Sequence, residues 1–172
     1  MNYLKESKYE ISHKEVKNPQ VSFITPIFNQ EKYLPNFIFS VQRQKLEKFE
    51  LIFVDDSSED NSTTIIKKIK KKDRRIKLIR NKKNKGALHS RYIGELNAKG
   101  EFIIFVDCDD FVMENGIFSS YIYTKKNNID IIQFHVVIIT KKLYINHFYL
   151  MFTIIILIIK KGQNIILHYG IN

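Results

Sequence analysis

Three aspartates stand together in the middle of the sequence, directly after a run of apolar residues. Asp107, Asp109 and Asp110 follow residues 102–106 (FIIFV), whose continuous apolar pattern is typical of a strand buried on both faces. Open α/β sheets bind their ligands at the carboxyl ends of such strands. Clustered carboxylates suit a hard divalent cation, because without a positive charge they raise one another's pKa. A solvated acidic turn is the alternative, and an isolated D-x-D match leaves it open.

Two other apolar runs also end in polar residues. Asp55 and Asp56 follow residues 49–54 (FELIFV), and a shorter run, residues 21–26 (VSFITP), stops at Pro26. The carboxyl ends of parallel strands meet at one edge of a sheet, and such a convergence predicts a site. The expected rim carries Phe28, Asn29, Asp55, Asp56, Asp107 and Asp109. For Asp55 and Asp56 alone, a helix-capping turn is the alternative.

Three stretches between these runs have apolar residues three or four positions apart, as in a helix with one buried face, and the first shows the full i, i+3, i+4 and i+7 spacing. The residues expected to face inward are Leu34, Phe37, Ile38 and Val41; Ile65, Ile66 and Ile69; and Leu88, Tyr92, Ile93 and Leu96. The first helix begins near Pro35, and Asp60, Asn61 or Ser62 caps the second. With a further strand at residues 76–79, the order β-α-β-α-β-α-β predicts an α/β fold with a mostly parallel sheet flanked by helices.

Length and composition indicate one globular domain. The chain has 172 residues, of which 44% are hydrophobic and 13% aromatic. Its single cysteine, Cys108, excludes an internal disulfide and fits a reducing compartment. The first twenty residues are polar and mixed in charge, which argues against a signal peptide.

The formal net charge of +10 comes from one segment. Residues 61–100 hold 14 of the 28 Lys and Arg residues but only two of the 18 Asp and Glu residues. Such a segment suits nucleic acid, anionic lipid or a phosphorylated substrate, and equally the solvated face of a helix and its loop. Aromatic residues are not interleaved with the lysines, which counts against nucleic acid.

The ends of the chain differ from its middle. Residues 1–20 are expected to form a polar arm, residues 21–139 a domain, and residues 140–172 a hydrophobic low-complexity tail. Residues 148–159 of this tail are almost entirely apolar, yet shorter than the ~20 residues that a bilayer-spanning helix needs. A buried strand, an interfacial segment and sequence never selected to fold are the alternatives for this run.

Five segments of the chain form an ordered series of motifs: residues 21–29 (VSFITPIFN), 31–35 (EKYLP), 50–58 (ELIFVDDSS), 84–86 (NKG) and 107–110 (DCDD). This series resembles, in the same order, the amino-terminal half of family 2 glycosyltransferases with the GT-A fold. The resemblance implies a Rossmann-like GT-A nucleotide-sugar-binding domain with an incomplete second half. It also implies a nucleotide-diphospho-sugar donor, usually a UDP-sugar, a Mn²⁺ or Mg²⁺ ion, and inversion at the anomeric carbon.

Site roles follow from the resemblance by position. Pro26 and Phe28 would line the base pocket, and Phe28 stands where the family usually has tyrosine. Asn29 would also bind the nucleotide-sugar. Asp56, with Asp55, would accept hydrogen bonds from the base or ribose. Further along the chain, Arg91 would face the diphosphate or base, Asp107 the ribose or a metal-bound water, and Asp109 the metal. Asp107 and Asp109 form the expected metal set of a DXD motif.

One departure concerns the general base that an inverting transferase needs, usually Asp or Glu. The family carries it in the second half of the domain, whereas the acidic residues here end at Asp130. The resemblance is therefore expected to stop, by truncation or a frame shift, after about Gln133, and no base is assigned.

The expected function is transfer of a sugar to a cell-surface glycan or glycolipid, as in polysaccharide biosynthesis. We also expect the protein to lie in the cytoplasm or at the inner membrane face, with peripheral contact to the membrane. No nucleic acid partner is expected. A catalytically inactive remnant that only binds the nucleotide-sugar is the alternative. A basic nucleic-acid-binding protein is the third hypothesis.

Overall fold

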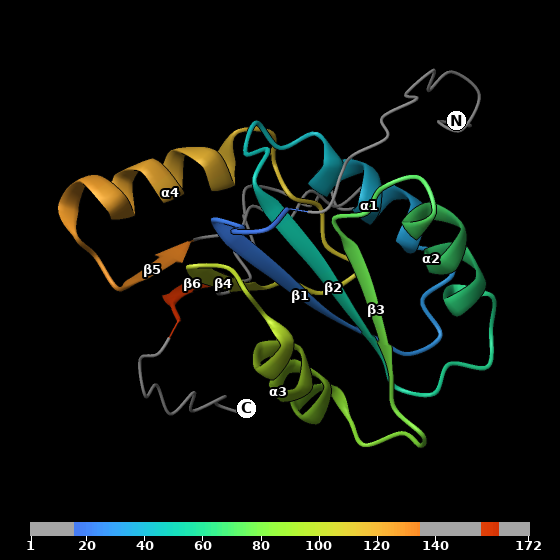
Figure 1. Ribbon diagram of the computed structural model, residues 1–172. Coiled ribbons are helices and arrows are strands. Elements are labelled where there is room, and N and C mark those ends of the chain that lie inside the picture. The colour runs from blue at the N-terminus through green and yellow to red at the C-terminus, as the bar shows by residue number, and fades with distance from the viewer. Residues whose placement is uncertain (1–15, 135–155, 162–172) are drawn as a thin grey trace, which may run out of the picture.

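The computed structural model describes residues 16–134 and 156–161, which form a six-stranded sheet with helices on both faces (Figure 1). The strand order is β3-β2-β1-β4-β6-β5. The bounds are β1 Val21–Ile27, β2 Phe49–Asp55, β3 Ile76–Arg80, β4 Phe102–Phe105, β5 Ile131–Phe134 and β6 Ile156–Lys160. The first four strands are mutually parallel, and β6 is antiparallel to both of its neighbours. The expected α/β fold with a mostly parallel sheet is confirmed.

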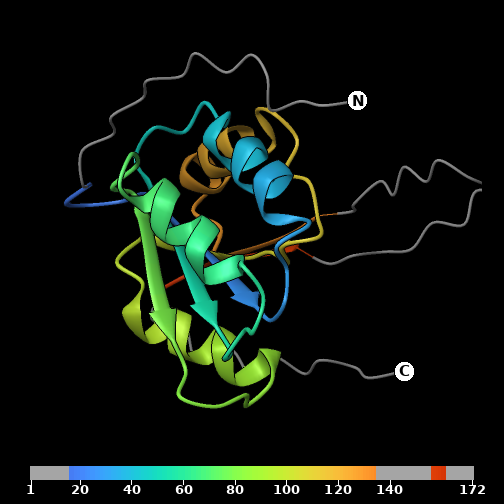
Figure 2. The same cartoon turned by 90° about the vertical axis from the view of Figure 1, so that its right-hand side faces the viewer.

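Four helices flank the sheet. They are α1 Leu34–Gln42, α2 Ser62–Lys70, α3 Ala87–Asn97 and α4 Gly116–Asn127. The view in Figure 2 shows α1 and α2 on one face of the sheet and α3 on the other, and α4 lies on the side of α1 (Figures 1 and 2). The longest of these helices, α4, has 12 residues, and none within the described ranges has the length and hydropathy needed to span a bilayer.

The larger of two cores lies between the sheet and helices α1, α2 and α4. Its largest side chains are phenylalanines, which meet edge to face: Phe23 with Phe49 at 5.5 Å and Phe37 with Phe53 at 6.1 Å between ring centroids. The smaller core lies on the α3 side of the sheet and contains Ile24, Ile52, Val54, Ala98 and Ile103. The predicted buried stripe of α1 belongs to the larger core, as does Ile66 of α2.

The predicted orientation of α3 is wrong. Three of the four apolar residues expected inside are between 56% and 63% exposed: Leu88, Tyr92 and Leu96. The helix instead buries Ser90 and Gly94, and a Cβ added at Gly94 would collide with the side chain of Ile24. Small residues allow the helix backbone to approach β1 closely, and this close approach sets the rotation of the helix about its axis.

Pro26 lies inside a central strand, where the missing N–H of proline normally breaks a ladder. The carbonyl of Ile24 accepts from Val106 after β4, and that of Ile27 accepts from Asp56 after β2, at 3.1 and 2.7 Å. Residues 24 and 26 of a parallel strand therefore face the same neighbour, which for Pro26 is β4. The paired positions of β1 and β4 end at Ile24, so Pro26 interrupts no bond of that ladder.

The strand β6 falls within the segment expected to be a separate tail. Residues 156–160 pair with both β4 and β5, so at least this part of residues 140–172 belongs to the sheet. Of the three alternatives for residues 148–159, a strand holds for the part from 156. The remainder of that run and the polar arm up to residue 15 lie outside the described residues.

The edge of the sheet where β1 to β4 begin is closed by a buried carboxylate. Glu50 on β2 is 2% exposed and accepts hydrogen bonds from the side chains of Ser22 and Lys77 and from the backbone N–H of Lys99. Burial alone would raise the pKa of Glu50, but these hydrogen bonds and the charge of Lys77 hold it below its ordinary value. The carboxylate thus joins three parallel strands and the segment that leads into β4.

Candidate functional site

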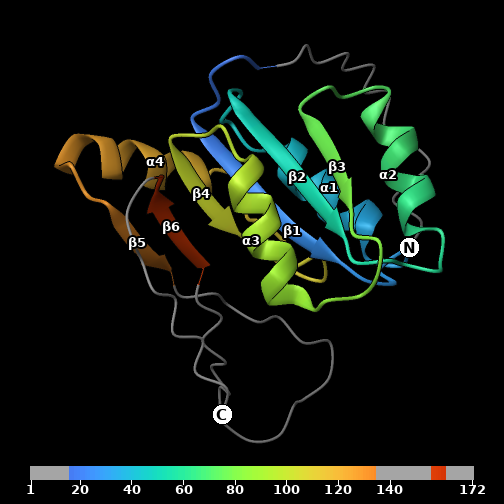
Figure 3. The same ribbon diagram turned by 60° about the horizontal axis from the view of Figure 1, so that its bottom comes forward.

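A pocket of about 380 Å³ opens at the opposite edge, where β1, β2 and β4 end and α3 begins. Figure 3 shows these strand ends together with the start of α3. The lining residues are Pro26, Ile27, Phe28, Gln30, Asp56, Asn84, Gly86, Ala87, Arg91, Asp107, Cys108 and Asp109. Six of the eight residues predicted for the site are among them: Pro26, Phe28, Asp56, Arg91, Asp107 and Asp109. Residues from separate strands therefore meet at one pocket, as the strand order requires.

Asp56 is the buried carboxylate of this pocket, with 3% of its surface exposed. It accepts hydrogen bonds from the Asn81 side chain at 2.7 Å, from the Lys85 N–H at 2.9 Å and from the Gly86 N–H at 2.6 Å. Burial alone would raise the pKa of Asp56, but these donors and the charge of nearby His89 hold it below its ordinary value. The group is therefore an anion in neutral solution.

Asp107 and Asp109 project from the loop after β4. Asp107 accepts a hydrogen bond from Arg91 of α3 at 2.6 Å. The side chain of Asp107 is 49% exposed and that of Arg91 is 19% exposed. Asp109 is exposed and has no ion pair within residues 16–134 and 156–161. The pocket thus holds one carboxylate already paired with a cation and one that is open to a ligand.

The negative charge of this loop exceeds its local positive charge. Burial raises the pKa of Asp110 to about 6, and the charges of Asp109 and Asp107 act in the same direction. The same three causes raise the pKa of the Cys108 thiol to about 12. Cys108 is 2% exposed and neutral, so it serves as packing and not as a nucleophile.

The loop after β4 offers two pocket carboxylates as metal ligands. Mg²⁺ in nucleotide sites commonly uses only one or two protein carboxylates, with phosphate and water completing its shell. The donor set of Asp107 and Asp109 therefore fits such an ion. No group of three His, Cys, Asp or Glu side chains within the described ranges is close enough to hold a metal by itself.

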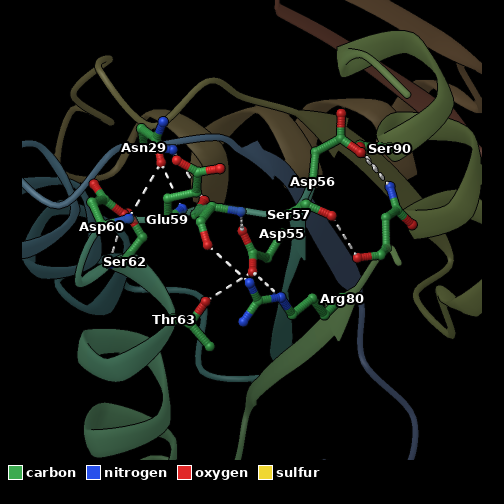
Figure 4. A network of polar contacts seen from close by, with 12 residues as sticks. Asn29, Asp55, Asp56, Ser57, Glu59, Asp60, Ser62, Thr63, Arg80 and Ser90 are labelled. Atoms are coloured by element: carbon green, nitrogen blue, oxygen red, sulfur yellow. Dashed lines mark hydrogen bonds and ion pairs between the residues drawn. The ribbon is translucent and has the colours of Figure 1, made fainter. Parts of the chain in front are cut away.

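Asn29 and Asp55 do not line the pocket, contrary to the prediction. Both instead belong to the network of polar contacts drawn in Figure 4. Asn29 has a left-handed φ of 53°, and its side-chain oxygen accepts from the Glu59 N–H at 2.9 Å. Asp55 is fully buried and accepts from the Ser58 N–H and the Thr63 hydroxyl, with Arg80 3.2 Å away. Both side chains bind the loop between β2 and α2, whereas Asp56 faces the pocket because successive residues at a strand end point to opposite sides.

Six pocket residues lay outside the sequence predictions for the site: Ile27, Gln30, Asn84, Gly86, Ala87 and Cys108. The side-chain oxygen of Gln30 is buried and has no hydrogen-bond partner among the described residues. The sequence signal that could have identified Ile27, Gln30 and Ala87 is their closeness in sequence to Pro26 and Gly86, which flank the two loops that form the pocket walls. Of the three capping candidates for α2, Asn61 occupies the N-cap position without a side-chain hydrogen bond to the helix, and Asp60 accepts from the Ser62 N–H at 2.9 Å.

The described geometry agrees with similarity to known proteins. A 99-residue match covers 58% of this chain and 40% of an uncharacterized glycosyltransferase of Haemophilus influenzae, with 40% identity. The poly(ribitol-phosphate) β-N-acetylglucosaminyltransferase TarP of Staphylococcus aureus is 38% identical over 116 residues, which cover 66% of this chain and 35% of TarP. The chain thus spans about two fifths or less of the length of these relatives.

Solved structures agree as well. The crystal structure of S. aureus TarS 1–349 in complex with UDP-GlcNAc superimposes with a TM-score of 0.62 and 29% sequence identity, covering 65% of this chain and 33% of that one. The model of the family Glycosyl transferase family 2 matches residues 22–170, so the family pattern continues past Gln133, where the sequence motifs were expected to stop. The chain therefore belongs to glycosyl transferase family 2.

Proposed function

We propose that this chain binds the donor of a glycosyltransferase reaction. In this reaction a sugar moves from a nucleotide-diphospho-sugar, namely a UDP-sugar, to a glycan or glycolipid, with inversion at the anomeric carbon. The observation that carries the proposal is that Asp56 and Asp109, from different strand ends, line one pocket together with Arg91. Family membership supports the reaction class, and the UDP-GlcNAc complex of the similar TarS supports the donor class.

The nucleoside would occupy the part of the pocket formed after β1 and β2. Phe28 is 46% exposed beside Pro26, which leaves its ring free to stack on a base. Asp56 offers a buried anion to a base or ribose donor at the same wall. The pocket therefore combines an apolar surface with a few polar groups, as small-molecule sites usually do.

The diphosphate would lie toward α3 and the loop after β4. Arg91 supplies the nearby cation, and Asp107 and Asp109 would hold Mn²⁺ or Mg²⁺. The bound ion would act as a Lewis acid that neutralises charge on the departing diphosphate. Asp107 already accepts a hydrogen bond from Arg91, so Asp109 is the carboxylate with more freedom to coordinate.

Calorimetric titration of the chain with UDP, with and without Mn²⁺, tests this proposal. We expect UDP to bind, Mn²⁺ to strengthen the binding, and Asp109→Ala to remove the effect of Mn²⁺. The matched control is Asp130→Ala, a half-exposed carboxylate that pairs with Lys160 away from the pocket. Failure of the wild-type chain to bind UDP under both conditions would overturn the proposal.

A binding-only protein is the second candidate function. No general base is assigned within the described residues, whereas the pocket offers groups for the donor. A donor-hydrolysis assay separates the candidates: UDP binding without turnover supports the binding-only protein. Salt-sensitive affinity for DNA or RNA that survives Asp109→Ala would instead support the nucleic-acid hypothesis.

The acceptor and the location of the protein belong to the same proposal. Phosphate-containing polymers and lipid-linked glycans both suit the basic segment 61–100, as does peripheral contact with an anionic membrane from the cytoplasmic side. Sedimentation with anionic vesicles at low and high salt tests the membrane contact, and loss of binding at high salt is expected.

A further inference from the structure

The carboxylate of Asp56 is bound by the loop between β3 and α3 before any ligand is present. Its two oxygens receive three donors from this loop, namely the Asn81 amide and the N–H groups of Lys85 and Gly86, at 2.6 to 3.0 Å. A carboxylate has about four lone-pair positions, so about one remains for a ligand. Most of the bonding capacity of Asp56 is therefore directed at the protein.

The same loop forms one wall of the pocket through Asn84 and Gly86. Gly86 has a left-handed φ of 88°, which favours glycine and aims its N–H at Asp56. Asn84 accepts a hydrogen bond from the same N–H at 3.1 Å. The shape of this wall therefore depends on where the backbone of residues 85 and 86 is held.

Three exposed lysines lie in the same loop. Lys82, Lys83 and Lys85 form no ion pair within residues 16–134 and 156–161. Asp56 accepts a hydrogen bond from the backbone N–H of Lys85, so its negative charge contacts a positively charged segment.

We propose that Asp56 is a positioning residue, which holds the β3–α3 loop in the shape of the pocket wall before the nucleotide binds. A mutation of Asp56 then weakens nucleotide binding mainly through the loop and only in part through a lost contact with the ligand. The inference rests on the proposed function for the identity of the ligand, whereas the clamp itself concerns the free protein. The two can therefore fail separately.

Amide hydrogen exchange of the ¹⁵N-labelled chain tests the clamp, with Asp56→Asn as the variant. In the free wild-type protein, the Lys85 and Gly86 amides should exchange slowly. In the free variant they should exchange about tenfold faster or more, because the amide cannot replace both charge-assisted acceptors. Saturating UDP with Mn²⁺ should restore much of the protection in the variant, because the ligand then holds the wall.

Asp60→Asn is the matched control, since Asp60 accepts from backbone N–H groups of Glu31 and Ser62 but does not line the pocket. It should leave the Lys85 and Gly86 amides unchanged. If Asp56→Asn does not fold, Asn81→Ala removes one of the three donors to the carboxylate and should also speed exchange of both amides. Weaker UDP binding by Asp56→Asn with unchanged exchange of both amides in the free variant would overturn the inference, because Asp56 would then act on the ligand alone.

Discussion

The two edges of the parallel sheet treat carboxylates in opposite ways. At the edge where the strands begin, Glu50 and Asp73 are nearly inaccessible, and each has its own cation, Lys77 or Arg75. At the edge where the strands end, the loop after β4 carries three aspartates, and among them only Asp107 has an ion pair in the described part of the chain. Charge is balanced around Glu50 and Asp73 and left in excess in the loop after β4.

This difference separates stability from function. A buried carboxylate with a full set of partners has nothing left to offer a ligand, and removing it leaves a cation and several donors without an acceptor. A carboxylate in a negative neighbourhood instead favours whatever cation approaches. Burial raises the pKa of Asp110 to about 6, and the negative charges of Asp109 and Asp107 add to this effect. Mutations at the two edges should therefore affect different measurements.

The largest effect should come from Asp109→Ala at the site edge. Losing a metal ligand should lower the rate of Mn²⁺-dependent donor hydrolysis on the order of 100-fold or more, since a Lewis acid contributes several kcal/mol. Where turnover is absent, the affinity for UDP with Mn²⁺ is the measurement. Urea unfolding should give an unchanged midpoint, because Asp109 is exposed. A large loss of stability would break the comparison between the edges.

Glu50→Gln at the opposite edge should have the reverse profile. We expect a loss of about 2–4 kcal/mol in the free energy of unfolding, because Lys77 and the Lys99 N–H lose an anionic acceptor. The affinity of the folded protein for UDP should not change. Glu47→Gln, at an exposed position of the same edge, is the control and should change neither measurement by more than about 0.5 kcal/mol.

Gly100→Ala tests how tightly the edge where the strands begin is packed. An added Cβ would lie 2.5 Å from the backbone nitrogen of Ser22, which cannot move without shifting β1. We expect destabilisation of about 1–3 kcal/mol by urea unfolding. Gly116→Ala is the matched control, because the nearest atom to its added Cβ is 3.9 Å away. Equal effects of the two substitutions would contradict this account of the packing.

The smallest effect should appear in the pH dependence of stability in metal-free buffer. The folded pKa of Asp110, about 6, lies above its ordinary value of 3.8, so the folded state binds the extra proton and gains stability as the pH falls from 7 to 5. Glu50, Asp56 and Asp73 have lowered folded pKa values, so stability should fall again below about pH 4.

The variant Asp110→Asn should remove only the first of these two changes. Its stability at pH 7 should exceed that of the wild type by on the order of 1 kcal/mol, and the difference should vanish near pH 4. Thermal unfolding across this range provides the measurement, with Asp130→Asn as the control. A wild-type profile that is flat between pH 5 and 7 would argue that the charge at the site edge is balanced after all.

The sequence predicted the features that depend on periodicity and chain order. Alternating strands and helices placed Asp56, Asp107 and Asp109 at strand ends, and parallel order brings such ends to one edge. Pro35 marked the first turn of α1, as the structure confirms. Local patterns of this kind depend on neighbouring residues, so they can be read without knowing the tertiary contacts.

Features set by tertiary contact were missed. Asp55 and Asp56 are adjacent in sequence, yet one lies under the loops and the other faces the pocket. The apolar pattern of α3 favoured an inward Leu88, whereas close packing of Gly94 against Ile24 turned that face outward. The strand β6 was not predicted, because the strands that it pairs with, β4 and β5, are both distant from it in the sequence.

The buried thiol at the floor of the pocket gives the protein a natural reporter. Cys108 is the single cysteine of the chain, so every thiol-specific reagent addresses one position between two of the site aspartates. Its burial and high pKa keep labelling slow in the resting protein. The rate of labelling therefore measures how often this loop opens, without any engineered probe.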